Sequence, residues 1–588
     1  MTDKQASGEF RFAIITDTHI RAPQGDLSSP FPVNEKANDR ARFACELIAA
    51  HEPEFTIHLG DMVHPLPHMA AYDEAVVEAK SIFTPLLPKL HFVPGNHDIG
   101  DKPSPGMPAK PATLDSVARY TSAFGEDWSS FEHKNTAFVI INSSLVNSGS
   151  ERENQQRQWL ERTLESFQGQ RIFLFSHYPP FITNPAETDH YDNYAEPGRS
   201  WLLSLASQYR IEAIFSGHVH HYFFNRFENV HLHCLPATSF TRQDYAEMFA
   251  VGPAEEYGRD DKGKFSVCIV EVKQSSYETK LIPTQGQSLS AGESFRKPEL
   301  KQGRTGLVPH LRHSWFESRH LPYNGPMEEF SRKRVRNDYP LLRLHQLGID
   351  TVRVPLSDRF DPAISSRIDD WAATGIKFVY FHIGVPDASI LTSLRSHSEA
   401  AALEILSAFD DIADIAPALD TVLSAIKLPV FVSRITTSAD VLDPSAVFAH
   451  SVSSGFRSEV IETTIGALDS LPLSRPPGLV FQIPWGQDPV DTVMVLADRL
   501  AASEYKLAVN LRLADSNPAS GNFADKKIAL VLRNALRVAR EHNHVMVQCD
   551  TFEDVDRGYH PRNGLIDRLG NIRLDCRQRY TLLARLHD

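Results

Sequence analysis

The chain of 588 residues is poor in cysteine. Its five cysteines lie far apart and form no CxxC pair: Cys45, Cys234, Cys268, Cys549 and Cys576. An odd, scattered set of this kind predicts neither a disulfide framework nor a zinc knuckle. A reducing compartment therefore fits the sequence best.

Long apolar runs are also missing. The first ten residues, MTDKQASGEF, contain no apolar core of signal-peptide length, and no later stretch is long and apolar enough to span a bilayer. We therefore expect a cytoplasmic protein that does not use a membrane as a partner.

Basic runs are absent as well. The chain has 60 Lys and Arg against 74 Asp and Glu, a net charge of −14, so a nucleic-acid polymer is a poor candidate partner. Its 42% hydrophobic and 23% charged residues are typical of globular proteins, and the length suggests two or three domains. This composition leaves a homo-oligomer open.

The first half alternates short apolar runs with helical patterns. Strands are expected in residues 10–17, 54–61, 89–98, 136–143, 171–178 and 211–220, and helices in residues 40–51, 71–87 and 153–167. This alternation predicts a layered α/β domain. Three further strands, in residues 231–239, 265–272 and 277–283, follow with few helices between them, so we expect the first domain to span residues 1–283.

A second α/β pattern follows a stretch with the composition of a linker. Residues 284–317 gather Gly, Ser, Gln and charge, which is typical of a domain boundary. Beyond them, strands are expected in residues 350–356, 376–385, 427–436, 478–486, 505–515 and 544–552. Six strands with intervening helices predict a (β/α) barrel-like domain over residues 318–588, and the sequence leaves open whether the barrel is complete.

Residues that commonly bind metals follow the apolar runs of the first half at five places. These are Asp17-Thr-His19, Gly60-Asp61, Gly95-Asn96-His97-Asp98, Ser176-His177 and Gly217-His218-Val-His220. In open α/β sheets, ligands bind outside the carboxyl ends of the strands. Side chains two apart in an extended segment point the same way, so each of the two pairs, Asp17/His19 and His218/His220, should present two ligands together.

Coincidence explains only part of this set. Gly, Asp, Asn and Ser are common in turns, which accounts for residues such as Asp61 and Asn96. It does not account for five histidines in the same places. A lone buried histidine is usually a satisfied core residue, but the ordered set predicts a metal site.

The ordered motifs DxH, GDxx, GNH[DE], H and GHxH resemble the signature of the calcineurin-like metallophosphoesterase superfamily over about residues 10–283. The resemblance implies a four-layer αββα sandwich that holds two metal ions. It also implies that Asp61 and a hydroxide bridge these ions, and that the hydroxide attacks the phosphorus in line.

The resemblance further implies a role for each motif residue. Asp17, His19 and His220 would bind the first metal together with Asp61, whereas Asn96, His177 and His218 would bind the second metal together with Asp61. His97 would bind no metal and would lie beside the leaving group. Mixed imidazole and carboxylate ligands suit Mn, Fe, Co or Zn better than Mg or Ca. We therefore expect two divalent transition metal ions.

The motif details narrow the substrate. Protein Ser/Thr phosphatases of this superfamily carry GDxxDRG and GNHE, whereas this chain has GDMVHPL and GNHD, with no arginine after Asp61 to clamp a dianionic phosphate. The GNHD and SHYPP segments resemble those of cyclic-nucleotide and glycerophosphodiester phosphodiesterases. The resemblance thus favours a small-molecule phosphodiester as substrate, with a phosphomonoesterase as the alternative.

Six residues flank the motif loops, and each of them either shapes the pocket or is an ordinary surface residue: His64, His68, His190, Tyr191, Tyr194 and His221. The sequence does not decide between these interpretations.

The last residues, 558–588, resemble the end of a glycoside-hydrolase-type (β/α) barrel. Retaining glycosidases need two carboxylates about 5–5.5 Å apart. The late strands end instead in Asn510-Leu-Arg512 and Gln482-Ile-Pro-Trp485. We therefore expect an accessory barrel without glycosidase activity, in which Trp485 either packs in the core or binds a sugar-like group. A bifunctional enzyme with a carbohydrate-binding or carbohydrate-cleaving barrel stays open, whereas the complete ligand set disfavours a binding protein with a dead metal centre.

Overall fold

The computed structural model divides the chain into two compact units. The sandwich unit consists of Met1–Pro298 and Glu317–Leu342, and the barrel unit consists of Glu299–Phe316 and Arg343–Asp588. The described residues are 8–105, 107–242, 255–298, 303–321, 332–407, 415–436, 453–515, 525–542, 545–554 and 563–572. Within these ranges, none of the helices has the length and apolar character that a membrane crossing requires.

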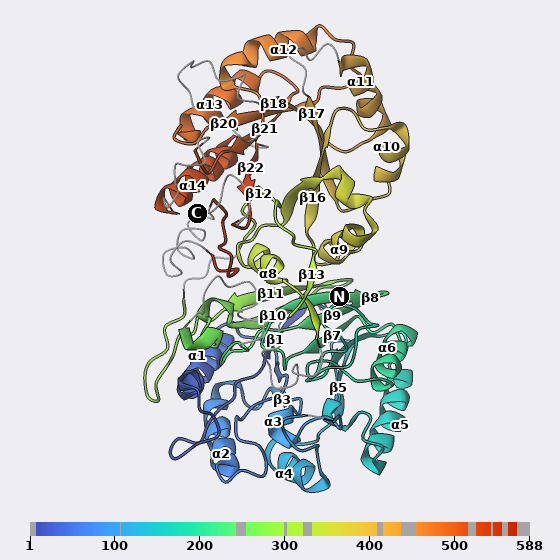
Figure 1. Cartoon of the computed structure of the whole chain (residues 1–588), viewed down its shortest axis with the longest axis vertical. Helices are drawn as coiled ribbons and strands as arrows, with labels where there is room; N and C mark the ends of the chain where they lie inside the picture. The colour runs from blue at the N-terminus through green and yellow to red at the C-terminus, as the bar shows by residue number, and fades with distance from the viewer. Residues whose placement is uncertain are drawn as a thin grey trace, which may run out of the picture. The chain divides into compact units, whose positions relative to one another are not determined.

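The sandwich unit contains two mixed sheets (Figure 1). The first follows the order β11-β10-β1-β2-β3, with β1 (Phe10–Ile15), β2 (Thr56–His58), β3 (Leu90–Phe92), β10 (Ser266–Val272) and β11 (Tyr277–Pro283). The second follows the order β4-β5-β6-β7-β9-β8, with β4 (Ser129–His133), β5 (Thr136–Ile140), β6 (Arg171–Phe175), β7 (Ala213–Ser216), β8 (Phe223–Phe227) and β9 (Val230–Cys234). Strands β1, β2 and β3 are parallel, as are β5, β6, β7 and β9, so the carboxyl ends of each set share one edge.

Aromatic side chains fill the space between the two sheets. The ring of Phe12 in β1 lies 5.4 Å from that of Phe138 in β5 and 5.9 Å from that of Phe173 in β6. Because side chains alternate along a strand, the neighbours of these residues in the second sheet point the other way. Ala137 and Ile172 accordingly pack in a separate apolar cluster on the outer face of that sheet.

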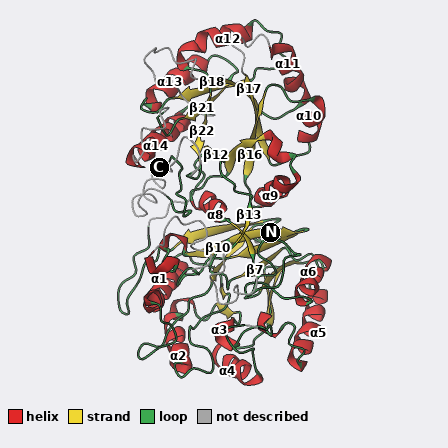
Figure 2. Cartoon of the chain, in the orientation of Figure 1, coloured by secondary structure: helices red, strands yellow, loops and turns green. Residues whose placement is uncertain are grey.

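Helices form the outer layers of the sandwich unit. Their bounds are α1 (Ala37–Ala49), α2 (Tyr72–Ile82), α3 (Asn96–Ile99), α4 (Leu114–Phe124), α5 (Glu151–Ser166) and α6 (Gly198–Gln208). Leu160 of α5 and Leu202 of α6 belong to the outer cluster of the second sheet. Figure 2 shows α1 and α2 on the opposite side of the unit. The expected αββα sandwich is thereby confirmed.

The barrel unit contains a closed barrel of eight parallel strands. Its strands are β12 (Leu307–His310), β15 (Thr351–Pro355), β16 (Lys377–Ile383), β17 (Ala400–Ser407), β18 (Val430–Thr436), β20 (Gly478–Ile483), β21 (Lys506–Leu511) and β22 (Met546–Thr551). Pairing of β12 with β22 closes the ring, and β19 (Ser453–Ser454) adds to β18 in the antiparallel sense. Figure 1 shows helices outside this ring, namely α9 (Pro362–Ala373), α10 (Ala388–Leu394), α11 (Ala416–Ala425), α12 (Ile461–Asp469), α13 (Pro489–Leu500) and α14 (Asp525–Glu541).

The expected (β/α) barrel-like domain is confirmed, and its ring of strands is complete. Strands β12 and β17 complete the ring, and neither was among the six predicted strands. Strand β12 has only four residues and lies inside the stretch of linker-like composition at residues 284–317. Strand β17, with the sequence AAALEILS, is short in β-branched residues and therefore gives a weak strand signal.

The structure also assigns residues 317–342 to the sandwich unit, whereas the expected barrel domain began at residue 318. Strands β13 (Ser318–His320) and β14 (Arg334–Arg336) pair in the antiparallel sense within this returning segment. Leu321 and Val335 pack with Ile182, Val219 and Phe223 in one buried apolar cluster. Burial of these two side chains explains why the segment returns to the first unit.

Candidate metal centre

The predicted ligand residues meet at the carboxyl ends of strands from both sheets. Asp17 and Asp61 follow β1 and β2, and Asn96 follows β3 at the start of α3. His177 and His218 follow the parallel strands β6 and β7 of the other sheet. The two sheets thus bring residues that are distant in the sequence to one place.

One group of donor atoms contains Asp17, His19, Asp61 and His220, whose candidate ligand atoms all lie within 4.8 Å of one another. The Nε2 atoms of His19 and His220 are 3.0 Å apart. His220 Nε2 is 3.2 Å from Asp17 Oδ1, and His19 Nε2 is 3.5 Å from Asp61 Oδ2. All four residues are buried.

A second group contains Asp61, His177 and His218, and Asn96 lies beside it. His177 Nε2 is 3.4 Å from Asp61 Oδ1 and 3.1 Å from Asn96 Oδ1. His218 Nδ1 is 3.0 Å from the same amide oxygen. Asp61 therefore belongs to both groups and uses a different carboxylate oxygen toward each.

Backbone carbonyls set the orientation of two of these imidazoles. His177 Nδ1 lies 2.8 Å from the carbonyl oxygen of Leu59, and His220 Nδ1 lies 2.8 Å from that of Phe240. A carbonyl only accepts, so each Nδ1 carries the proton and a neutral ring has its lone pair at Nε2. These lone pairs face carboxylate oxygens, and a positive charge between the atoms would turn repulsion into attraction. Metal-binding histidines are commonly held in this way.

The pKa values of the ligand side chains also indicate that this site favours a positive charge. Burial lowers the pKa of His177, but the nearby Asp61 carboxylate outweighs it and raises the pKa to about 9. Burial raises the pKa of Asp61, yet His177, His97 and His19 together hold it well below its usual range. Burial, followed by repulsion from a neighbouring histidine, lowers the pKa of His19 and of His218. Those two imidazoles are therefore neutral, the form that binds metals.

The backbone at the ligands is left-handed, which is uncommon for residues other than glycine. The φ angles are 51° at Asp17, 46° at His19, 53° at Asp61, 68° at His218 and 57° at His220. The expected convergence of the two i, i+2 pairs is thus present, but a left-handed backbone and not an extended one produces it. Such conformations cost about 1–3 kcal/mol each and cluster at functional sites.

The glycines of the motifs allow close approach of the chain to the ligands. A Cβ atom at Gly217 would overlap Thr16 Oγ1 and lie 2.7 Å from Asp17 Oδ2. A Cβ atom at Gly95 would overlap the backbone nitrogen and Oδ1 of Asp61. Any side chain at either position would therefore displace a predicted ligand.

We expect Gly217→Ala to lower the free energy of unfolding by about 1–3 kcal/mol and to reduce the metal content, because the added methyl group pushes Asp17 away. Urea unfolding and elemental analysis measure the two effects. Gly466→Ala is the control, since a Cβ atom at Gly466, on α12, has open space around it. If the two variants retain metal equally, Gly217 does not support the Asp17 ligand.

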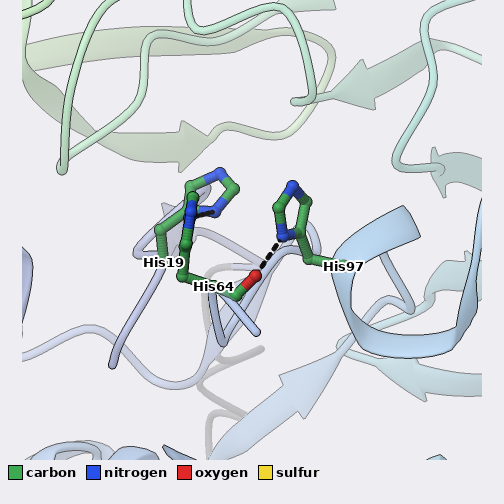
Figure 3. Close-up of side chains that lie close together, drawn as sticks. All are labelled: His19, His64 and His97. Atoms are coloured by element: carbon green, nitrogen blue, oxygen red, sulfur yellow. Dashed lines mark hydrogen bonds between the residues drawn. The ribbon is translucent and has the colours of Figure 1, made fainter. Parts of the chain in front are cut away.

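Figure 3 shows that His19, His64 and His97 also lie together. Their rings have candidate ligand atoms within 4.8 Å, with His64 Nδ1 and His19 Nδ1 3.1 Å apart. The backbone N–H of His97 donates to Asp61 Oδ1 over 2.8 Å, and its ring Nδ1 donates to the carbonyl oxygen of His64. The Nε2 atom of His97 takes no part in either bond. The His97 ring is half-buried, unlike the buried rings of the two donor groups.

Sequence reasoning gave no role to Asp98, although the residue is part of the GNHD motif. Its buried carboxyl accepts the backbone N–H groups of Asp61, Met62 and Gly95 over 2.8 to 3.0 Å. It thereby fixes the loop that presents Asp61 against the loop that presents Asn96. The position of Asp98 one residue after the predicted ligands was the available signal.

A buried ion cluster beside His218 was also missed. Asp192 Oδ1 is 3.8 Å from His218 Nε2 and pairs with Arg242, and Asp192 Oδ2 is 2.7 Å from Lys333 Nζ. The side chains of Asp192 and Lys333 are 0% and 1% exposed. Lys333 lies in the returning segment, far beyond the last motif, so no sequence pattern linked it to this site.

We expect Lys333→Met to destabilise the protein by about 3 kcal/mol, because it removes a buried cation that compensates the charge of Asp192. Loss of this support should also weaken metal binding by the group that contains His218, about tenfold. Urea unfolding and a metal titration measure both. Arg334→Met is a matched control, since Arg334 is the exposed next residue. Equal behaviour of the two variants would show that the Lys333–Asp192 pair contributes nothing.

The structure separates the six flanking residues, whose roles the sequence left undecided, into those at the metal centre and those with other contacts. His64 lies at the centre, and the Tyr191 ring lies 4.7 Å from that of His218. Tyr194 is buried with its hydroxyl 2.7 Å from Ser176 Oγ, and His221 stacks on Tyr339. His190 pairs with Glu187, and His68 is exposed.

Residues 10–222 match the calcineurin-like phosphoesterase family. Serine/threonine-protein phosphatase CPPED1 from Danio rerio is 29% identical over 178 residues, 29% of this chain and 54% of that protein, and the Mus musculus protein has the same identity and coverage. The chain thus spans about half the length of these curated relatives.

Among solved structures, purple acid phosphatase PPD1 from yellow lupin (Lupinus luteus) seeds is 16% identical, with 48% of this chain and 53% of that chain covered and a TM-score of 0.35. The family match covers all the predicted ligands, from Asp17 to His220. Residues 10–222 of this chain are therefore a calcineurin-like phosphoesterase domain.

Proposed function

We propose that the sandwich unit hydrolyses a small-molecule phosphodiester with two divalent transition metal ions. The observation that carries this proposal is the pair of donor groups that share Asp61. In this proposal Asp17, His19, Asp61 and His220 hold one ion, and Asp61, Asn96, His177 and His218 hold the other. The mixture of imidazole and carboxylate donors suits Mn, Fe, Co or Zn.

When bound, the two ions activate water and neutralise the phosphoryl oxygens. The residues of the chain position the ions and assist the leaving group. Asp61 sets the spacing of the two donor groups, and the carbonyls of Leu59 and Phe240 hold the imidazoles of His177 and His220 in place. His97 is held through its backbone N–H and through its Nδ1, which donates to the carbonyl oxygen of His64. In its imidazolium form the ring carries a second proton, on Nε2, and donates that proton to the departing oxygen.

The charge of the surroundings favours a diester over a monoester. A phosphodiester carries one negative charge, whereas a monoester carries up to two at neutral pH. Arg242 lies beside the centre, with its guanidinium 4.8 Å from the Tyr191 ring, but it is paired with the buried Asp192. The Asp192 carboxylate occupies the Arg242 guanidinium and so limits its contact with a dianion, although Lys333 adds a second positive charge to this cluster.

The second candidate is a phosphomonoesterase. It is favoured by the name of the curated relatives, which are serine/threonine-protein phosphatases. The motif differences after Asp61 and the ion pair of Arg242 argue against it. In either case the net charge of −14 favours a substrate other than a nucleic-acid polymer.

A substrate panel distinguishes the candidates. The full chain is stripped of metal, reconstituted with Mn²⁺ and assayed with bis(p-nitrophenyl) phosphate, a glycerophosphodiester, p-nitrophenyl phosphate and a phosphoserine peptide. We expect kcat/KM for the aryl diester to exceed that for the aryl monoester at least about tenfold, a difference of about 1.4 kcal/mol in the barrier. A preference for the monoester or the peptide would establish the second candidate. Absence of hydrolysis throughout the panel would overturn both.

A further inference from the structure

The inward-facing side chains of the barrel change from apolar to polar toward the carboxyl ends of the strands. The apolar level packs as one cluster of Val308, Val379, Ala402, Phe431, Val480 and Ala508, with Met546 beside it. Two residues further along each strand, the same face carries His310, Phe381, Glu404, Ser433, Gln482, Asn510 and Gln548. A barrel stabilised by packing alone would carry apolar residues at both levels.

The polar level forms a connected network around Glu404 of β17. Arg353 Nε and Nη2 donate to the two carboxylate oxygens of Glu404 over 2.7 and 3.1 Å, and Gln548 Nε2 donates to Glu404 Oε2 over 3.1 Å. The Arg353 guanidinium lies 4.1 Å from the Phe381 ring centre, and Arg353 Nη1 is 3.2 Å from His310 Nδ1. Residues of five different strands thus meet in this network.

A second ion cluster lies beyond the polar level, further toward the carboxyl ends of the strands. Asp550 is two residues beyond Gln548, and Arg512 is two residues beyond Asn510. Asp550 Oδ1 is 3.3 Å from Arg512 Nη1 and 3.6 Å from Arg312 Nη2. Among the residues of these two clusters, three guanidinium groups face two carboxylates, which leaves an excess of one positive charge.

Two buried polar atoms at the polar level have no hydrogen-bond partner among the described residues. They are the hydroxyl of Ser433 and the amide oxygen Oε1 of Gln548, and both side chains belong to residues that are 0% exposed. An unsatisfied buried polar atom costs about 1–3 kcal/mol, so a barrel selected for stability alone would not keep it. These atoms would be satisfied by a bound molecule.

We propose that the carboxyl end of this barrel binds a small anion that carries several hydroxyl groups, such as a sugar acid or a sugar phosphate. Hydroxyl groups donate and accept at once, as the mixture of Ser433, Gln548 and Asn510 requires. The excess positive charge at Arg512 and Arg312 matches one anionic group. The site consists of residues of the barrel unit and would bind its ligand without metal.

The structure supports binding at this site and not glycoside cleavage. A glycosidase needs one carboxyl group that can give up a proton to the leaving oxygen. Both oxygens of Glu404 accept from Arg353, and Asp550 faces Arg512 and Arg312. The expectation of a barrel without glycosidase activity is kept as part of this proposal.

Isothermal titration of the full chain tests the proposal. Glucuronate and glucose 6-phosphate are the anionic probes, glucose and acetate are the controls, and the protein is kept in chelator so that the metal centre cannot bind phosphate. We expect one of the two anionic probes to bind at least about tenfold more tightly than both controls. Glucuronate would identify a sugar acid, and glucose 6-phosphate alone would identify a sugar phosphate. No heat from either anionic probe up to about 10 mM, or equal binding of glucose or acetate, would overturn the proposal.

Two variants locate the site. Ser433→Ala should raise the Kd of the bound probe about 5- to 10-fold, the effect of one hydrogen bond, while its Tm stays the same or rises because a buried unsatisfied hydroxyl is gone. Arg512→Gln should remove the preference for the anionic probe over glucose. Ser389→Ala is the control, because Ser389 is exposed on α10. Unchanged binding by both Ser433→Ala and Arg512→Gln would show that the ligand binds elsewhere and overturn the proposal.

Discussion

Asp61→Ala is expected to lose metal from both donor groups and to lower kcat/KM by about 10³-fold or more. The two oxygens of Asp61 face different groups of ligands, so a single substitution removes a donor from each. Metal ions contribute several kcal/mol to stabilisation of a phosphoryl transition state, and each 1.4 kcal/mol is a factor of ten in rate. Elemental analysis after gel filtration and an assay with an aryl diester measure the two losses.

Glu161→Ala is the control for this substitution, because Glu161 is an exposed carboxylate on α5 of the same unit. It should retain about two metal ions per chain and full activity. An Asp61→Ala protein that binds as much metal as the control would contradict the shared-ligand arrangement. Loss of one ion only would show that Asp61 serves a single site.

His97→Ala should keep its metals and lose activity in a way that depends on the leaving group. General-acid assistance is worth about 10²–10⁴-fold, and a poor leaving group needs it most. We therefore expect a loss of about 10²-fold or more on an alkyl diester and a much smaller loss on a p-nitrophenyl diester. Steady-state kinetics on both substrates, together with metal analysis, measure this difference.

The alternative role for His97 is purely structural, since its ring holds the His64 carbonyl and its backbone N–H holds Asp61. The backbone bond survives in the alanine variant, so only the ring contact is removed. Under this alternative the metal content falls and both substrates lose activity alike. Equal losses on the two substrates would therefore rule out donation to the leaving group. His68→Ala, at an exposed histidine in a nearby loop, is the control.

The sandwich fold was predictable because five of the apolar runs that indicate strands are each followed by a motif, in the order that the superfamily shows. The runs around Phe12, Phe173 and Phe215 are almost continuously apolar, as strands covered on both faces require, and the motifs follow their carboxyl ends. Strands β4 and β8 were missed. Both are outer strands of the second sheet that pair in the antiparallel sense, and β4 has partly exposed faces and little apolar alternation.

The barrel was harder to predict from the sequence. Strand β12 is short and lies in a stretch with the composition of a linker, and β17 is rich in alanine. Missing β17 also concealed Glu404, because the search for carboxylates considered only the ends of two later strands. Of the residues resembling the end of a glycoside-hydrolase barrel, only 563–572 lie within the described ranges.

The metal centre also combines residues that the sequence predicted with residues that it did not predict. The ligands were named from the residue types that follow the strands and from the resemblance to the superfamily, and the structure brings them into two groups. The residues that support them are set by tertiary structure: the carbonyl of Phe240, the Asp192 carboxylate and Lys333 from the returning segment. Pairing across such distances leaves no periodic signal in one sequence. The left-handed backbone at the ligands was equally hidden, because aspartate and histidine do not require it.

Anomalous diffraction from crystals of the Mn²⁺-reconstituted protein tests the two-metal centre most directly. We expect two anomalous peaks on either side of Asp61, one among Asp17, His19 and His220 and the other among Asn96, His177 and His218. A single peak, or a peak among His19, His64 and His97 in place of either, would contradict this expectation.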